Sequence, residues 1–192
     1  MPPAARHSRE DILEAAFGIL RAEGPSALTA RHLGEVLGGS SRPIFTLFRS
    51  MQEVQTGAME RAKDLYSSYL DRGLRADPPF KGAGMEHIRF AADEPRLFQE
   101  IFMSPANAGW GGSRLFLQSE ANYARILHSL TGYYALPPDA AGRLYEHLWI
   151  YAHGLASLIA TGVMPADMDR ISRQLTEVFS SLLPHCQKGE LL

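Results

Sequence analysis

The sequence predicts an all-α fold of about nine helices, and two observations support this prediction. Apolar residues recur at spacings of three and four along nearly the whole chain, which is the period of a helix that buries one face. No segment shows the convincing alternation of apolar and polar residues that a half-buried strand requires. Glycine and proline residues separate the periodic segments, so they predict where helices end.

The predicted helices can be placed in order along the chain. The first follows a capping Ser8, with Asp11 three residues later, and ends at Gly24. A long helix starts at Ser50 and continues to about Leu74, where its apolar residues stop. The later predicted elements are short helices at Met85–Ala92 and after Glu94, a loop at Ser104–Ser113, a helix lined by Phe116, Ser119, Tyr123, Ile126 and Leu130, a long helix from Pro138, and a last helix with Ile171–Leu182.

Residues Thr29 to Val54 contain the most informative pattern. Two short amphipathic segments lie on either side of Gly38 and Gly39, a pair that ends a helix in a tight turn. Ser40 and Ser41 can cap the second segment. Leu33, Val36 and Leu37 supply the first apolar face, Ile44, Leu47 and Phe48 supply the second, and Ser50 with Glu53 forms a capping box for the long helix. Two short helices joined in this way predict a DNA-binding helix-turn-helix.

Several of these motifs together resemble the N-terminal domain of the TetR family of one-component repressors, over about residues 8–54. They are Asp11–Phe17, Gly24, Leu28, Thr29, Leu33, Gly38, Gly39, Ser40, Ile44, Phe45 and Phe48–Ser50. Trp149, His153 and Gly154 are similar to a Trp…His-Gly signature of one group of TetR-type C-terminal domains, and Arg89–Phe102 resembles that group more weakly. The resemblance implies a DNA-binding domain over residues 1–52 and a helical ligand-binding and dimerisation domain over residues 53–192.

The start of the second short helix supplies the candidate DNA contacts. Arg42 lies in its first turn, from which an arginine can bind guanine O6 and N7 or, alternatively, a phosphate. The resemblance implies a phosphate contact at Thr29, although this residue could act only as a helix cap. Phe45 and Met51 replace the usual tyrosine and lysine of the family, which predicts weaker non-specific binding. The predicted DNA-binding residues are Thr29, Ser40, Ser41, Arg42, Pro43, Phe45, Thr46 and Arg49.

The second domain is expected to bind a mostly apolar effector and to form a homodimer. Trp149 and His153 lie four residues apart on one helix face, where they could line a pocket or, as we favour, pack at a helix crossing. The predicted pocket residues are Phe90, Phe98, Phe102, Tyr123, Trp149 and His153. The predicted dimer residues on the last two helices are Leu155, Leu158, Ile171, Leu175, Phe179 and Leu182.

Composition excludes other classes of protein. The net charge of −2 does not indicate a nucleic-acid binder, and the first fifty residues hold six arginines against five acidic residues. The single cysteine fits a reducing cytoplasm, where we expect this protein. Scattered histidines predict no metal site or cofactor, and Gly109–Ser113 lacks the lysine of a phosphate-binding loop. The apolar run Leu148–Met164 is predicted to be a buried helix rather than a membrane span.

The sequence therefore predicts a repressor that binds a double-stranded DNA operator as a homodimer and is released by an unknown small molecule. An all-α protein-interaction or scaffold module, whose N-terminal head does not bind DNA, is the alternative. The near-neutral charge of the first fifty residues, together with Phe45 and Met51, keeps that alternative open. An enzyme has no catalytic motif in its favour.

Overall fold

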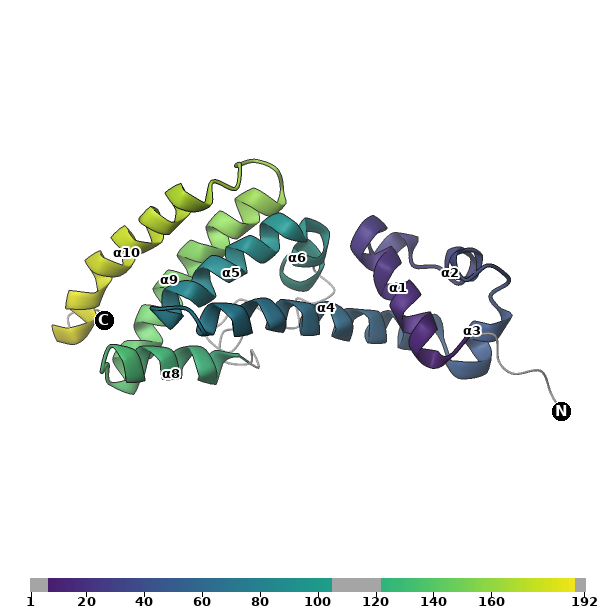
Figure 1. Ribbon diagram of the computed structural model, residues 1–192, viewed down its shortest axis with the longest axis horizontal. Coiled ribbons are helices and arrows are strands. Elements are labelled where there is room, and N and C mark those ends of the chain that lie inside the picture. Colours follow the sequence, from purple (N-terminus) through teal and green to yellow (C-terminus); the bar gives the residue numbers. More distant parts are fainter. Residues whose placement is uncertain (1–6, 105–121, 189–192) are drawn as a thin grey trace.

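A computed structural model describes residues 7–104 and 122–188 of the 192-residue chain. Within these residues it contains nine α-helices, one short 3-10 helix and no strand, which confirms the predicted all-α class. The helices form an elongated molecule with a small N-terminal head at one end and a larger group of helices at the other (Figure 1). No helix in the described ranges is both long and apolar enough to span a membrane.

The head consists of α1 (Arg9–Glu23), the 3-10 helix η1 (Pro25–Ala27), α2 (Ala30–Val36) and α3 (Arg42–Leu47). Helix α1 begins at the predicted cap, because the Ser8 hydroxyl accepts from the Asp11 N–H while the Asp11 carboxylate accepts from the Ser8 N–H. The helix ends at Gly24, as predicted. The side chains that join the three helices are fully or almost fully buried: Ile12, Leu33, Ile44 and Phe48.

The turn between α2 and α3 depends on two glycines. Gly38 has a φ of 75°, a backbone conformation that residues with a Cβ atom rarely adopt. Gly34 packs so closely on the start of α3 that an added Cβ would lie 2.8 Å from the backbone nitrogen of Ser41. Val36 differs from the sequence expectation, because 52% of it is exposed and only Leu33 and Leu37 of that predicted face turn inward.

Helix α4 (Met51–Leu74) connects the head to the rest of the molecule (Figure 1). Its bounds match the prediction, and Ser50 caps it by accepting from the Glu53 N–H. The predicted capping box is only half formed, since the Glu53 carboxylate accepts from the Arg49 N–H and binds the Arg9 guanidinium instead of returning to Ser50. Its buried face runs through both units of the molecule: Val54, Ala58, Ala62, Tyr66 and Leu70.

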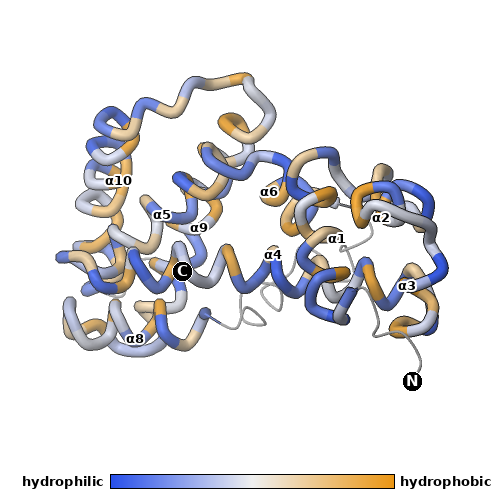
Figure 2. The backbone as a smooth tube through the Cα atoms, turned by 45° about the vertical axis from the view of Figure 1, so that its right-hand side comes forward, coloured by the Kyte–Doolittle hydropathy of each residue, from blue (hydrophilic) through white to orange (hydrophobic). Residues whose placement is uncertain are grey.

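Five helices form the larger unit together with the far half of α4: α5 (Pro79–Asp93), α6 (Pro95–Phe102), α8 (Tyr123–Tyr133), α9 (Pro138–Ala160) and α10 (Met168–Lys188). Helix α5 lies between α4 and α9, and α10 packs on both α9 and α5. Hydrophobic and hydrophilic residues alternate along these helices at short intervals, as expected for amphipathic helices with one buried face (Figure 2).

Two elements differ from their predicted bounds. Helix α5 starts at Pro79, earlier than expected, because a proline in the first helical turn loses no hydrogen bond. Helix α10 continues through Pro184 to Lys188. The predicted loop Ser104–Ser113 falls almost entirely outside the described residues, as do Phe116 and Ser119 of the following predicted helix.

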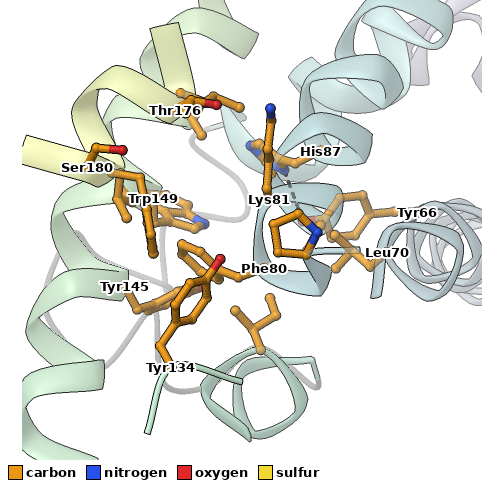
Figure 3. A pocket seen from close by; sticks show the side chains of 18 residues that line it. Tyr66, Leu70, Phe80, Lys81, His87, Tyr134, Tyr145, Trp149, Thr176 and Ser180 are labelled. Atoms are coloured by element: carbon orange, nitrogen blue, oxygen red, sulfur yellow. Dashed lines mark hydrogen bonds between the residues drawn. The ribbon is translucent and has the colours of Figure 1, made fainter. Parts of the chain in front are cut away.

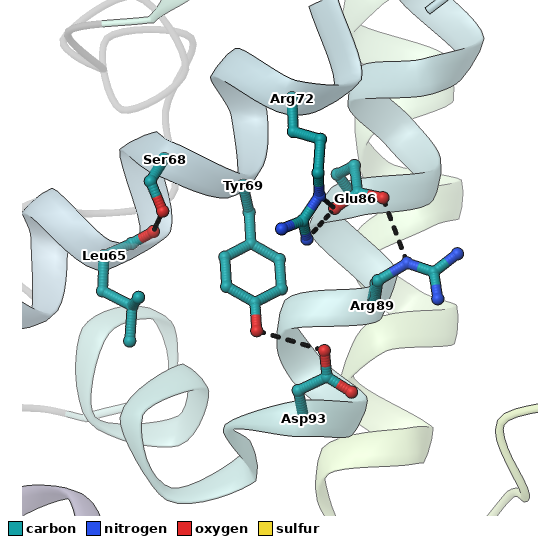
Figure 4. Close-up of polar contacts among 7 residues, drawn as sticks. All are labelled: Leu65, Ser68, Tyr69, Arg72, Glu86, Arg89 and Asp93. Atoms are coloured by element: carbon teal, nitrogen blue, oxygen red, sulfur yellow. Dashed lines mark hydrogen bonds and ion pairs between the residues drawn. The ribbon is translucent and has the colours of Figure 1, made fainter.

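Polar contacts fix α5 against α4 on the side away from the core (Figure 4). The Tyr69 hydroxyl donates to the Asp93 carboxylate at 3.1 Å, and Glu86 lies between the guanidinium groups of Arg72 and Arg89. Further along, Gly73 and Gly82 bring the two backbones so close that a Cβ on either residue would overlap the other helix. These contacts make α4 and α5 one closely packed pair.

Candidate nucleic-acid interface and interior cavity

Helix α3 presents the candidate DNA-contacting residues of the head. Arg42 is its first residue and Pro43 its second, as expected if the helix begins at Ser41. Ile44 is buried against the head, so the other side of this short helix faces solvent. Arg42, Phe45 and Thr46 are all exposed there, and half of the Phe45 side chain is accessible.

The ion pairs of the head leave two arginines available. Arg9 binds the Leu47 carbonyl and Glu53, Arg21 binds Glu94, and Arg31 binds Glu35 at 3.0 Å. Among the described residues, Arg42 and Arg49 have no ion-pair partner, and both lie in or next to α3. The positive charge available to a polyanion is therefore concentrated at α3, although the net charge of the head is close to zero.

The eight residues predicted to contact DNA lie at the N-terminus of α2 and in and around α3. Six are exposed, while Ser41 and Pro43 are half-buried. Two hydroxyls already have local partners: Thr29 accepts from the His32 N–H at 3.2 Å, and Thr46 donates to the Pro43 carbonyl at 2.6 Å. Their role in DNA contact stays a prediction.

The second notable feature is a cavity of about 290 Å³ between α4, α5, α8, α9 and α10. Aromatic and aliphatic side chains form most of its wall, and α4 contributes Tyr66 and Leu70 directly (Figure 3). Thr176 and Ser180 of α10 lie at its exposed side, together with Lys81 of α5. A mostly apolar concave site with a few polar groups is typical of small-molecule binding sites.

A chain of polar groups lies at the buried side of this cavity. The Tyr66 hydroxyl is 3.0 Å from Nδ1 of His87, and Nε2 of His87 is 3.4 Å from Nδ1 of His153. Burial lowers the pKa of His87 to about 3, with a smaller contribution from His153, and burial lowers the pKa of His153 to about 4. Both imidazoles are therefore neutral near pH 7, and the chain joins α4, α5 and α9.

Aromatic rings surround the two histidines. The ring of His153 stacks on Trp149 with centroids 4.5 Å apart and planes 7° apart. Phe98 and Phe102 each pack on both imidazoles, with ring centroids 5.4 to 5.7 Å apart. The two phenyl rings also contact each other, with centroids 5.0 Å apart. Trp149 and His153 thus occupy a helix crossing, the arrangement favoured from the sequence, and Trp149 also lines the cavity.

The remaining predicted pocket residues do not line the cavity. Phe90 and Phe98 are fully buried in the core, and Phe102 and His153 lie in the aromatic cluster beside the cavity. Tyr123 packs edge-on against Tyr145, which does line the cavity, with ring centroids 5.2 Å apart. The predicted pocket residues lie on α5, α6, α8 and α9, whereas the cavity is lined by α4, α5, α8, α9 and α10. Most of the selected residues belong to the core beside the wall, because helical periodicity cannot distinguish a cavity wall from solid core.

The predicted dimer residues divide between the inside and the outside of the chain. Leu158 is 42% exposed, whereas Leu155, Ile171 and Leu175 are at most 8% exposed. Leu175 and Phe179 line the cavity, and Phe179 packs on Tyr134 with ring centroids 4.8 Å apart; Leu182 is half-buried. The apolar face of α10 therefore mainly closes the cavity, because α10 packs across α5 and α9 of its own chain.

Helix α9 has an apolar surface on its outer side. Ile150 is 59% exposed and Leu158 is 42% exposed, with the exposed Gly154 between them at helical spacing. Within the described ranges, no group of three or more His, Cys, Asp or Glu side chains is arranged to hold a metal ion. The strongest candidate sites are therefore the exposed face of α3, the interior cavity and the outer face of α9.

The two short helices of the head, joined by a glycine turn, have the arrangement of a helix-turn-helix, and the other helices enclose a cavity. In agreement, a family model described as "Tetracyclin repressor-like, C-terminal domain" matches residues 80–179. This match covers more than half of the chain, so the protein belongs to the TetR family of regulators. Among curated proteins, none matches the chain. The Trp…His-Gly group within the family stays a prediction.

Three features of the site were missed at the level of sequence. They are Lys81 and His87 at the cavity, and Gly34 beneath α3. His87 could have been found from its spacing, since it lies between the apolar residues Ala83 and Phe90 on the buried face of α5. Lys81 gave no comparable signal, because a lysine near a helix end is usually solvated.

Proposed function

We propose that this protein is a homodimeric repressor whose heads bind a DNA operator and release it when a small, mostly apolar molecule enters the cavity. The observation that supports this most directly is that α4 contributes to both sites. Its first half packs under the head, and Tyr66 and Leu70 in its second half form part of the cavity wall. A ligand would therefore contact the helix that holds the head.

DNA recognition is assigned to the exposed face of α3. Arg42 would read a base edge in the major groove, with Phe45 in apolar contact beside it, while Arg49 would bind phosphate. Operator affinity would depend on few phosphate contacts, because the other described arginines of the head are engaged in ion pairs.

Dimerisation is assigned to α9 and α10, with the outer face of α9 at the centre. Ile150 and Leu158 would pack against their counterparts about a two-fold axis, and Gly154 would allow the two copies of α9 to approach closely. Two heads related by that axis would meet successive major grooves, about 34–36 Å apart. We also propose that the DNA-binding domain ends near residue 52, that the protein is cytoplasmic and that it has no catalytic activity.

The exposed apolar residues of the head support one alternative. Val36 and Phe45 are each at least half exposed, and a protein partner could cover them as well as DNA could. In that case the protein would be an interaction or scaffold module.

Binding to the DNA upstream of the gene for this protein tests the proposal and separates it from the alternative. Fluorescence anisotropy at several salt concentrations should show specific binding that weakens as salt rises. Binding of equal strength to unrelated DNA, or no binding, would contradict the proposed function and favour the interaction module.

A further inference from the structure

We infer that the cavity selects organic anions, with a compact ring system inside and an acidic head group bound by Lys81. This inference rests on the proposed function, since it names the class of ligand that the cavity would take. It follows from the distribution of charge around the cavity and from the shape of its wall.

Lys81 is the one charged side chain among the described residues that line the cavity. It lies in the first turn of α5 and is half-buried, with no ion-pair partner within the described part of the chain. The acidic residues of α5 lie elsewhere: Glu86 is held by Arg72 and Arg89, and Asp93 accepts from Tyr69 (Figure 4). Asp77, which precedes α5, accepts from the Tyr133 hydroxyl and does not line the cavity. Lys81 therefore places a positive charge at the edge of an apolar space whose wall contains no carboxylate.

The buried side of the cavity, opposite Lys81, contains no charged group among its lining residues. His87 is neutral near pH 7 because burial lowers its pKa to about 3, and it is already bonded to Tyr66. A cationic ligand would meet the Lys81 ammonium group without any carboxylate in the cavity wall to offset it. A neutral ligand would leave that ammonium group to water, whereas an anion would gain a charge-assisted hydrogen bond.

The wall of the cavity limits the rest of the ligand. An inorganic anion at Lys81 would leave the aromatic wall made by Phe80, Tyr134 and Trp149 without contacts (Figure 3). At about 290 Å³ the cavity lies just below the usual range of about 300–1,000 Å³ for ligand sites. An aromatic or alicyclic carboxylate or sulfonate therefore fits better than a long acyl chain. Thr176 and Ser180 supply further hydroxyl groups on the exposed side of the cavity.

Two fluorescent probes that differ only in the acidic group test this inference without any DNA. Anilinonaphthalene sulfonate is the anion, and phenylnaphthylamine has the same rings without the sulfonate. Lys81→Met should lower the affinity for the sulfonate at least about 10-fold, which corresponds to about 1.4 kcal/mol, and leave the uncharged probe within about twofold. Lys81→Arg should retain the wild-type preference.

Matched variants identify where the probes bind. Lys188→Met removes the same charge at the end of α10, outside the cavity, and should change neither affinity. Ala152→Trp fills the cavity and should abolish binding of both probes. Equal losses for both probes in Lys81→Met, no loss for either, or sulfonate binding that survives in Ala152→Trp would overturn the inference. Failure to bind the upstream DNA would instead contradict the proposed function and leave these titrations unaffected.

Discussion

At the scale of single residues, Arg42 and Arg49 lie only seven positions apart but should contact different parts of DNA. Arg42 begins α3, whereas Arg49 follows the end of that helix. We expect Arg42→Ala to cost about 1–3 kcal/mol on the operator and to relax the preference at one base pair per half-site.

Arg49→Ala is the matched control, because it should weaken binding to all sequences equally. Anisotropy titrations with the operator and with single-base variants measure both effects. If Arg42→Ala also weakened binding to every DNA sequence equally, Arg42 would contact phosphate. Other residues of α3 would then recognise the bases.

The buried histidines predict how stability depends on pH. In the folded protein the pKa of His87 is lowered to about 3 and that of His153 to about 4, both below the ordinary value of 6.5. Below pH 6.5 these two imidazoles become protonated in the unfolded chain but stay neutral in the folded protein. The free energy of unfolding therefore decreases as the pH falls towards the two lowered pKa values. Each histidine should contribute a loss of about 1.4 kcal/mol per pH unit.

Urea unfolding between pH 6.5 and pH 5 measures this loss at pH values above the usual titration range of carboxylates. His153→Phe should roughly halve the slope, because it removes one of the two buried imidazoles. Ser157→Ala, on α9 but without a titratable group, should retain the wild-type slope. A free energy of unfolding that stays constant over this pH range would show that the two histidines become protonated without unfolding.

At the scale of elements, the helices were largely predictable from sequence because their ends are marked chemically. Ser8, Gly24, Ser50 and Pro138 stand at or next to observed helix ends, as caps and helix breakers should. The packing of those helices was less predictable. Ile171 and Leu175 of α10, which were predicted to meet a second copy of the chain, are buried where α10 packs on α5 and α9 of its own chain. Only a three-dimensional arrangement distinguishes these outcomes, and the dimer itself stays a prediction.

A second connection between the head and the larger unit was not visible in sequence at all. Arg21, in the last turn of α1, donates to Glu94, which stands before α6 and has a side chain only 8% exposed. The two residues are 73 positions apart, so no local pattern predicts the pair. The hydrogen bond to Glu94 raises the pKa of the Arg21 guanidinium.

This connection makes a testable contribution to stability. Arg21→Met should destabilise the protein by about 1–3 kcal/mol, because it leaves the buried Glu94 carboxylate without its partner. The double variant with Glu94→Met should recover part of this loss, since no unpaired charge then remains. A double-mutant cycle by urea unfolding gives the coupling energy, and additive effects of the two substitutions would show that the pair contributes nothing to stability.

At the scale of the whole molecule, the outer face of α9 predicts the oligomeric state. Leu158→Glu would place a charge in the proposed two-fold interface, so it should convert a dimer into monomers while helicity is retained. Light scattering at micromolar concentration measures the change. Ser68→Glu, on the exposed side of α4, is the control and should remain dimeric. A monomeric wild-type protein would contradict the interface.

The monomeric variant also separates folding from DNA binding. Each head folds around its own buried core, so Leu158→Glu should leave the head intact. Operator affinity should nevertheless fall, because a single head makes only half of the contacts.

The last prediction concerns the coupling between the cavity and the head. A ligand beside Tyr66 and Leu70 would press on the second half of α4. Tilting α4 would move the head, and in a dimer it would change the spacing of the two recognition helices. Typical allosteric coupling of about 1–3 kcal/mol changes affinity about 5- to 150-fold, which is sufficient for release from an operator.

Because such coupling is reciprocal, the operator must weaken ligand binding by the same factor by which the ligand weakens operator binding. Titrating the ligand into the free protein and into the operator complex measures that factor from one side, and anisotropy with labelled operator measures it from the other. DNA of unrelated sequence and equal length is the control, and it should leave the affinity for the ligand nearly unchanged. A molecule that binds with equal affinity in the presence and absence of operator would occupy the cavity without acting as an inducer.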